Sequence, residues 1–384
     1  MSVHSILPGV PIVESPLFDC IIAEGSIPAD LVPVARALHE RGFAVIDFPD
    51  NAIFNRIDRI KSNLTPRYPI DLDDPQAIKA TGDSRIQDAW RFDEDVAAIA
   101  SNAKILEMLT TLWGRRAFPF QTLNFPVGTQ QAPHSDAVHF SSLPERFMCG
   151  VWIAFEDIGA QAGPLLYYPG SHRWPLLTNQ LIGQVGEKQK ALSAQAPFER
   201  AWKAMIEAQG IQSETFLARK GQALIWTANL LHGGSPQIDL RLTRWSQVTH
   251  YYFEDCIYYT PAFSDEPIGR LDLRTITNIA DGTVEPNSYL GRKVGAQQSV
   301  PRDGLVKRLF GKRSQGTPAR TQTDVLAPVG DEVSIEGKHG INASLPEDFD
   351  DKLYLALHLD VASTGMPARQ HYEQFGRAEG RRYR

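Results

Sequence analysis

Two histidines, one aspartate and one arginine carry the strongest chemical signal in this sequence. His134 and Asp136 are separated by one residue, and His232 and Arg244 follow far downstream. Two imidazoles and one carboxylate can occupy one face of an octahedral ferrous ion and leave the opposite face open for a cosubstrate and dioxygen. These residue types therefore outline a non-haem iron oxygenase.

The spacing of His134 and Asp136 has a geometric reason. In a β-strand, side chains at i and i+2 point to the same side, so both can reach one metal while Ser135 turns away. The third ligand must come from a distant strand, and the segment 222–227 is predicted to deliver His232. Arg244 opens a segment of strand composition, 244–253, and its guanidinium is a natural partner for a carboxylate bound in one orientation.

An isolated His-x-Asp pair is weak evidence, because the same residues beside a proline are also typical of a surface loop. Further motifs occur around this pair in a fixed order: Gly-Phe-Ala-Val-Ile-Asp at 42–47, Leu-Asn-Phe at 123–125, Trp152, Gly-Pro-Leu at 163–165 and Pro-Gly-Ser-His-Arg-Trp at 169–174. Together with His232 and Arg244 they resemble the phytanoyl-CoA dioxygenase family of Fe(II)- and 2-oxoglutarate-dependent oxygenases, which includes ectoine hydroxylases. The resemblance covers roughly the first 260 to 300 residues, a span that suits one large domain.

The resemblance implies roles for particular residues. His134, Asp136 and His232 would be the iron ligands. Arg244 would anchor the distal carboxylate of 2-oxoglutarate, and Arg241 competes with it for this role. We favour Arg244, because the residues after it have strand composition, whereas Arg241 falls in the turn expected around residues 236–239.

Four other residues are candidates for the site. Asn124 and Trp152 match positions that lie against the cosubstrate in related proteins. Ser235 is a weaker match, since the family often has a serine two residues after the distal histidine, where this chain has Gly234. His139, three residues beyond Asp136, can contact substrate or hydrogen-bond a ligand, and a plain surface or core histidine is an equal alternative.

Two more histidines are expected to be structural. His172 lies in the Pro-Gly-Ser-His-Arg-Trp segment and is expected to hold a turn, because a fourth protein ligand would block an open iron position. His250 lies six residues beyond Arg244, so on a strand it can face the same cavity. We expect it to be a hydrogen-bonded core histidine.

The resemblance also implies a reaction. Fe(II), 2-oxoglutarate and dioxygen would together yield succinate, carbon dioxide and a hydroxylated product, while the protein orients the substrate and protects its own side chains. Asp136 bears on the outcome, since related halogenases have a small residue at this position that admits chloride. A carboxylate favours hydroxylation or desaturation.

Composition is consistent with this interpretation. The chain has 384 residues, of which 42% are hydrophobic, so it can bury a substantial core. Its net charge of -6 argues against a nucleic-acid binder, and no run of about 18 apolar residues predicts a membrane span. The N-terminus lacks the pattern of a secretory signal, and three scattered cysteines without a CxxC pair are typical of reduced thiols. We expect a cytoplasmic protein.

The order of elements predicts a fold of the α+β, mainly β class: a double-stranded β-helix, or jelly roll, braced by helices. Helical periodicity covers 27–41, 52–64, 95–113 and 198–208, and apolar strand candidates cover 43–48, 118–125, 149–155, 165–168, 222–226 and 244–253. The metal site is expected inside the jelly roll. The polar segment 180–215 would either cover the active-site mouth or decorate the outside of the fold.

Three domains are predicted: an oxygenase domain (1–300), a linker (301–344) and a helical module (345–384). The linker is first basic and then rich in Gly, Pro, Ser and Thr. The last 40 or so residues resemble a short helical module appended to bacterial glycosyltransferases and cell-surface proteins. So small a core needs another surface to dock on, so the module is either a docking unit in glycan biosynthesis or a cap on the oxygenase.

The substrate class is left open between a saccharide or envelope-associated metabolite and another small molecule or acyl derivative. Two other functions compete with an oxygenase. A non-catalytic jelly roll would bind glycans together with the module, but it has no need of all four residues of the site. A zinc hydrolase would use the same three ligands and would leave Arg244 unexplained.

Overall fold

The computed structural model describes residues 2–79, 84–186, 194–295, 346, 349–358, 367–373 and 383. Internal contacts divide the chain into one unit of residues 1–295 and 350–384 and a second unit of residues 296–349. The predicted linker, 301–344, lies outside the described residues. No helix in the described ranges is long and apolar enough to cross a membrane.

A six-stranded antiparallel sheet forms the centre of the fold, with strand order β1-β8-β5-β10-β3-β2. Its strands are β1 (Phe43–Asp47), β2 (Ile86–Gln87), β3 (Ala117–Phe125), β5 (Met148–Ala154), β8 (Gln222–Thr227) and β10 (Ser246–Phe253). All seven residues of β5 and all eight of β10 are buried, because both faces of these central strands are covered. Arg244 lies two residues before β10 rather than within it, contrary to the predicted strand boundary.

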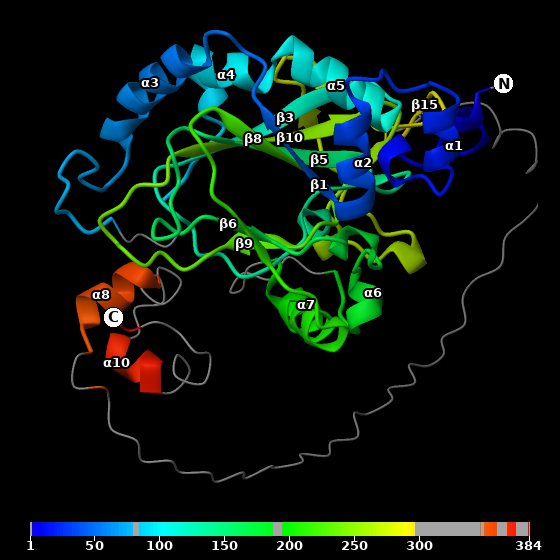
Figure 1. The fold of residues 1–384 in the computed structure, drawn as a ribbon. Helices are drawn as coiled ribbons and strands as arrows, with labels where there is room; N and C mark the ends of the chain where they lie inside the picture. The colour runs from blue at the N-terminus through cyan, green and yellow to red at the C-terminus, as the bar shows by residue number, and fades with distance from the viewer. Residues whose placement is uncertain are drawn as a thin grey trace, which may run out of the picture. The chain divides into compact units, whose positions relative to one another are not determined.

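A three-stranded antiparallel sheet faces the large one: β6 (Leu165–Tyr167) lies between β7 (Glu214–Phe216) and β9 (His232–Gly234). Figure 1 shows β6 and β9 on the side of the large sheet that faces away from α3, α4 and α5. Aromatic pairs join the sheets, with ring centroids 4.2 Å apart for Phe43 and Tyr167 and 5.7 Å apart for Trp152 and Phe216. Two antiparallel sheets packed face to face, with helices on one side, make the predicted jelly roll of the α+β class.

Five helices contribute to the core outside the large sheet: α1 (Phe18–Ala23), α2 (Val32–Arg41), α3 (Ile53–Leu64), α4 (Glu94–Ala100) and α5 (Ala103–Trp113). The prediction of a single helix over 95–113 was wrong. The Asn102 side chain accepts hydrogen bonds from the backbone of Lys104 and Ile105, at 3.0 and 3.1 Å, and so caps a new helix.

Further elements are two helices in the predicted insertion and short pairs of strands. Helices α6 (Asn179–Ile182) and α7 (Ala196–Gln209) lie in the predicted insertion, and Phe198 and Trp202 of α7 bury their rings beside Val138 and Leu231. Two-stranded pairs are formed by β4 (Ser141–Leu143) with β11 (Ile257–Tyr259), β12 (Ile276–Thr277) with β13 (Val284–Glu285), and β14 (Ser288–Tyr289) with β15 (Arg292–Lys293).

Two short helices lie in the described part of the predicted C-terminal module: α8 (Asp351–Leu357) and α10 (Ala368–His371). Tyr354 is fully buried, and its hydroxyl lies 3.0 Å from Nδ1 of His371. The Tyr372 ring meets Tyr354 edge-on at 5.5 Å. The contact between these two short helices is therefore built around Tyr354.

Candidate metal centre

His134, Asp136 and His232 converge at one point inside the jelly roll. All three are buried, and one potential ligand atom from each lies within 4.8 Å of the others. The Nε2 atom of His134 is 3.9 Å from Asp136 Oδ1, and the Nε2 atom of His232 is 3.7 Å from Asp136 Oδ2. The predicted grouping of two imidazoles and one carboxylate is thus formed by the fold.

Backbone carbonyls fix both imidazole rings. Nδ1 of His134 donates to the Ala132 carbonyl at 2.9 Å, and Nδ1 of His232 donates to the Leu230 carbonyl at 3.0 Å. A neutral ring that carries its proton on Nδ1 presents an unprotonated Nε2, which is the form that binds a metal. Both rings are therefore set to bind an ion through Nε2.

The two histidines are also paired through their backbones. His134 N donates to His232 O at 2.9 Å, and His232 N donates to His134 O at 3.0 Å, which makes an isolated antiparallel bridge. The predicted strand through both His134 and Asp136 is wrong beyond this bridge, since Asp136 begins the 3-10 helix η5 (Asp136–Val138). Ser135 ends the extended stretch because its side chain accepts a hydrogen bond from Ala137 N at 3.2 Å and caps the turn.

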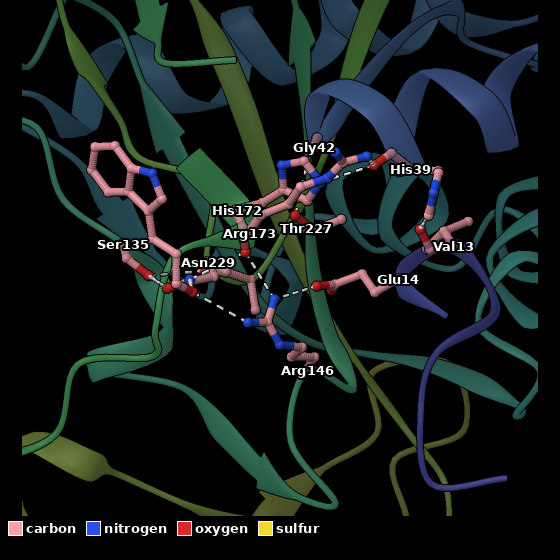
Figure 2. A network of polar contacts seen from close by, with 12 residues as sticks. Val13, Glu14, His39, Gly42, Ser135, Arg146, His172, Arg173, Thr227 and Asn229 are labelled. Atoms are coloured by element: carbon pink, nitrogen blue, oxygen red, sulfur yellow. Dashed lines mark hydrogen bonds and ion pairs between the residues drawn. The ribbon is translucent and has the colours of Figure 1, made fainter. Parts of the chain in front are cut away.

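Figure 2 shows a polar network that stabilises this turn through Ser135. The Ser135 hydroxyl lies 3.1 Å from both the Ala228 carbonyl and Asn229 Oδ1. Asn229 Nδ2 then donates to the carbonyls of His172 and Trp174, at 3.2 and 2.7 Å.

Arg146 continues the network toward the N-terminal segment. It donates to the same two carbonyls and pairs with the buried carboxylate of Glu14. His172 therefore holds a turn, as predicted, and it does not line the metal cavity.

The charges of the triad suit a metal. Burial opposes ionisation of Asp136, yet the facing His232, with His250 and His134, holds the Asp136 pKa well below its usual range. Burial lowers the pKa of His134 to about 3. An ionised carboxylate is one of the donors that a divalent cation requires.

A cavity of about 870 Å³ opens onto the triad, and Arg244 lines its interior. Arg244 is 3% exposed, and burial lowers its pKa to about 10. Its Nε and Nη1 atoms are buried without a hydrogen-bond partner in the described part of the chain, and so is the indole Nε1 of Trp152. A buried guanidinium without an acceptor is costly, so this end of the cavity fits an anion such as a carboxylate.

The rival arginine lies elsewhere. Arg241 is half-exposed and binds Asp239 through Nε and Nη2, at 2.9 and 2.8 Å. It does not line the cavity. The structure thus brings Arg244, and not Arg241, to the candidate cosubstrate site.

Of the other four predicted site residues, two line the cavity and two do not. Trp152 lines the cavity, with its ring centre 5.6 Å from the Arg244 guanidinium carbon, and His139 lines it as well. Asn124 does not, because it alternates with Leu123 and Phe125, and its amide donates to Gln247 at 3.2 Å. Ser235 is also absent from the cavity, and its backbone N–H donates to the Pro164 carbonyl.

Several residues that the sequence did not single out line the same cavity: Arg85, Gln87, Gln121, Gln131, Gln195 and Trp226. His250, expected only as a core histidine, lies with Nε2 3.5 Å from Asp136 Oδ2. Strand alternation carried a signal for Trp226, which is two residues from the inward-facing Leu224. The contact between His250 and Asp136 has no sequence signal, because it depends on how the turn that begins at Asp136, distant in the sequence, is placed against β10.

A jelly roll that holds a His-Asp-His triad and a buried arginine, whose Nε and Nη1 atoms have no partner among the described residues, fits the class of Fe(II)- and 2-oxoglutarate-dependent oxygenases. Residues 59–238 match the phytanoyl-CoA dioxygenase (PhyH) family. The chain thus contains a domain of this family of Fe(II)- and 2-oxoglutarate-dependent oxygenases, and it is an enzyme of that kind.

Several solved structures are similar to this chain. The epimerase SnoN, in complex with Fe3+, alpha ketoglutarate and nogalamycin RO, is 18% identical with a TM-score of 0.46, over 69% of this chain and 97% of SnoN. EctD from S. alaskensis with 2-oxoglutarate and 5-hydroxyectoine is 18% identical, with a TM-score of 0.44 over 63% and 81% of the two chains. AviO1 from Streptomyces viridochromogenes Tue57 is 15% identical, with a TM-score of 0.40 over 57% and 93%. Comparison with curated proteins found no match.

Proposed function

We propose that this oxygenase hydroxylates a C–H bond of a small, polar molecule, with iron on His134, Asp136 and His232 and the distal carboxylate of 2-oxoglutarate on Arg244. The observation that carries the proposal is the buried Arg244 guanidinium, which lines the same cavity as the triad and has two nitrogen atoms without a partner among the described residues. Iron would supply the oxidation, in which 2-oxoglutarate, dioxygen and the substrate C–H group together would yield succinate, carbon dioxide and a hydroxylated product.

The side chains of the cavity have separate tasks. Three protein ligands on one face leave the other iron positions open. Arg244 fixes 2-oxoglutarate at its far end through a charge-assisted pair, while Trp152, Phe125 and Val248 make an apolar wall that excludes water around it. Asp136 itself supports hydroxylation over halogenation, because its carboxylate fills the position that a halide would need.

The lining of the cavity constrains the substrate. Asp136 is the single acidic residue among the described residues that line it, so no second carboxylate there would attract a cationic group. The lining instead offers amides from Gln87, Gln121, Gln131 and Gln195. These groups hydrogen-bond hydroxyls as donors and acceptors, which supports a saccharide or another hydroxylated metabolite.

His139 also contributes to this lining. Its Nε2 lies 3.4 Å from Gln195 Oε1, which also accepts from Gln131 Nε2 at 3.2 Å, and Gln195 donates to Glu199 at 3.0 Å. Gln195 precedes α7 directly, so the predicted insertion supplies part of the cavity wall. We therefore assign His139 and Gln195 to substrate binding.

Docking of the C-terminal module to glycan-biosynthesis machinery, and the division at residues 300 and 344, rest on sequence features alone and stay predictions. Removal of residues 345–384 tests the docking role. It should abolish co-purification with glycosyltransferases.

The decisive experiment is anaerobic addition of Fe(II) and 2-oxoglutarate to the wild type and to His134→Ala. The wild type should develop the weak visible metal-to-ligand charge-transfer band, and on exposure to oxygen it should form succinate. His134→Ala should do neither. A folded wild type that binds iron but forms no succinate with any hydroxylated substrate would favour a binding protein, and turnover that consumes no oxygen would favour a hydrolase.

A further inference from the structure

A row of four residues crosses the large sheet beneath the metal centre. Trp226 on β8 pairs with Gly150 on β5, Gly150 pairs with His250 on β10, and His250 pairs with Gln121 on β3. Register partners in neighbouring strands project to the same face, so the row shares one face of the sheet. Trp226, His250 and Gln121 all line the cavity.

Two members of the row meet the same oxygen of Asp136. The indole Nε1 of Trp226 donates to Asp136 Oδ2 at 2.8 Å, and both groups are buried. His250 Nε2 lies 3.5 Å from this oxygen, and the ring is held by Gln121, whose Oε1 is 2.9 Å from His250 Nδ1. Asp136 Oδ1 accepts no side-chain or backbone hydrogen bond from the residues that the structure describes.

Gly150 leaves the space that the indole occupies. A Cβ atom at this position would lie 2.2 Å from Trp226 Cζ2 and 2.3 Å from Cε2, far inside contact distance. These atoms belong to a rigid ring in a buried site, so they cannot move aside as a flexible chain end does. A glycine inside a central strand is costly, and here it permits a close approach of an indole to the backbone.

From this geometry we propose that Trp226 is a positioning residue, which holds Oδ2 of Asp136 so that the carboxylate gives the metal Oδ1 alone. Gly150 makes the arrangement sterically possible. The inference rests on the metal site proposed above. Its consequence is a free coordination position: a carboxylate bound through both oxygens would leave two positions instead of three, which is too few for a chelating cosubstrate together with dioxygen.

The test uses Co(II) alone as the probe, added to the full chain without oxygen, with visible absorption as the readout. Trp226→Phe keeps a ring and removes the N–H group. We expect its Co(II) affinity to fall about 10- to 100-fold, the usual loss when a hydrogen bond to a metal ligand is removed, with a changed absorption band. Trp113→Phe is the matched control, because Trp113 is also fully buried and donates one hydrogen bond, to the Arg146 carbonyl at 3.2 Å.

Two further variants separate positioning from folding. Replacement of Trp226 by β-(3-benzothienyl)alanine exchanges the N–H for sulfur and preserves the ring shape, so it should reproduce the loss in affinity without loss of structure. Gly150→Ala should weaken Co(II) binding in the wild type, but much less in Trp226→Phe, where the smaller ring leaves space.

The outcomes are distinct. Co(II) affinity and spectrum within about twofold of wild type in both Trp226 variants would overturn the positioning role. No Co(II) binding by the wild type, or unchanged binding by His134→Ala, would instead refute the metal site itself.

Discussion

His134 and His232 are joined by two reciprocal backbone hydrogen bonds, of 2.9 and 3.0 Å, although they are far apart in the sequence. The candidate metal centre is thus built on a β-bridge, and the distance between the two imidazoles is set by backbone pairing. Because such pairing tolerates little displacement, sites on hydrogen-bonded backbone are more precise than sites on free loops.

Arg244 should control 2-oxoglutarate affinity. Arg244→Met removes a charged hydrogen-bond donor of about 1.5–3 kcal/mol, so the dissociation constant for 2-oxoglutarate should rise about 10- to 100-fold. Anaerobic titration of the Fe(II)-loaded protein measures it through the charge-transfer band. Arg241→Met, which loses only an exposed ion pair, should bind 2-oxoglutarate like the wild type, and the reverse result would move the anchor to Arg241.

Gly233, next to the candidate ligand His232, should not accept a side chain. A Cβ atom there would lie 2.6 Å from the Gln131 carbonyl oxygen, so backbone would have to shift. Gly233→Ala is expected to lower the free energy of unfolding by about 1–3 kcal/mol and to weaken metal binding. Gly159→Ala is the control, because a Cβ there meets nothing within 4 Å, and chemical denaturation should show less than about 0.5 kcal/mol of change. Equal stability of the two variants would contradict the prediction.

His172 should make the protein less stable in acid. Burial lowers its pKa in the folded state from 6.5 to about 4, so the unfolded chain binds the proton more readily between these values. Its contribution to stability is complete above pH 6.5 and is lost as the pH falls toward 4. At pH 5 this loss amounts to about 2 kcal/mol.

Urea unfolding at pH 7 and pH 5 measures this effect. The decrease in the free energy of unfolding should be about 2 kcal/mol smaller in His172→Gln than in the wild type, since glutamine does not titrate. An equal decrease in both proteins would assign the acid sensitivity to other groups.

Removal of Arg146 should destabilise the fold more than removal of its whole ion pair. Burial raises the pKa of Glu14, and Arg146 opposes that rise, so Arg146→Met strands a buried carboxylate at an expected cost of about 3–5 kcal/mol. The double variant Glu14→Gln, Arg146→Met should recover part of this loss. Thermal unfolding of both variants decides the matter, and a double variant that is less stable than Arg146→Met would exclude the stranded charge as the cause.

Much of the fold was readable from local patterns. Runs of apolar residues predicted the strands 118–125 and 149–155 to within a residue or so of β3 and β5, and helical periodicity over 52–64 predicted α3. Boundaries fixed by side-chain caps were missed: Asn102 divides one predicted helix into two, and Ser135 turns a predicted strand into a 3-10 helix. A cap is a single local hydrogen bond, and periodicity does not record it.

The sequence by itself determined the residue types of the site, their order along the chain and the class of chemistry, because ligand identity is a property of individual side chains. Only the tertiary structure decided which of them meet. It placed Arg244 in the cavity and Arg241 at the surface, and it turned Asn124 to the other face of its strand. It also brought Trp226 to Asp136 across Gly150. The physical reason is that these relationships depend on strand register and on turns that place distant segments together, and neither is encoded within any one segment.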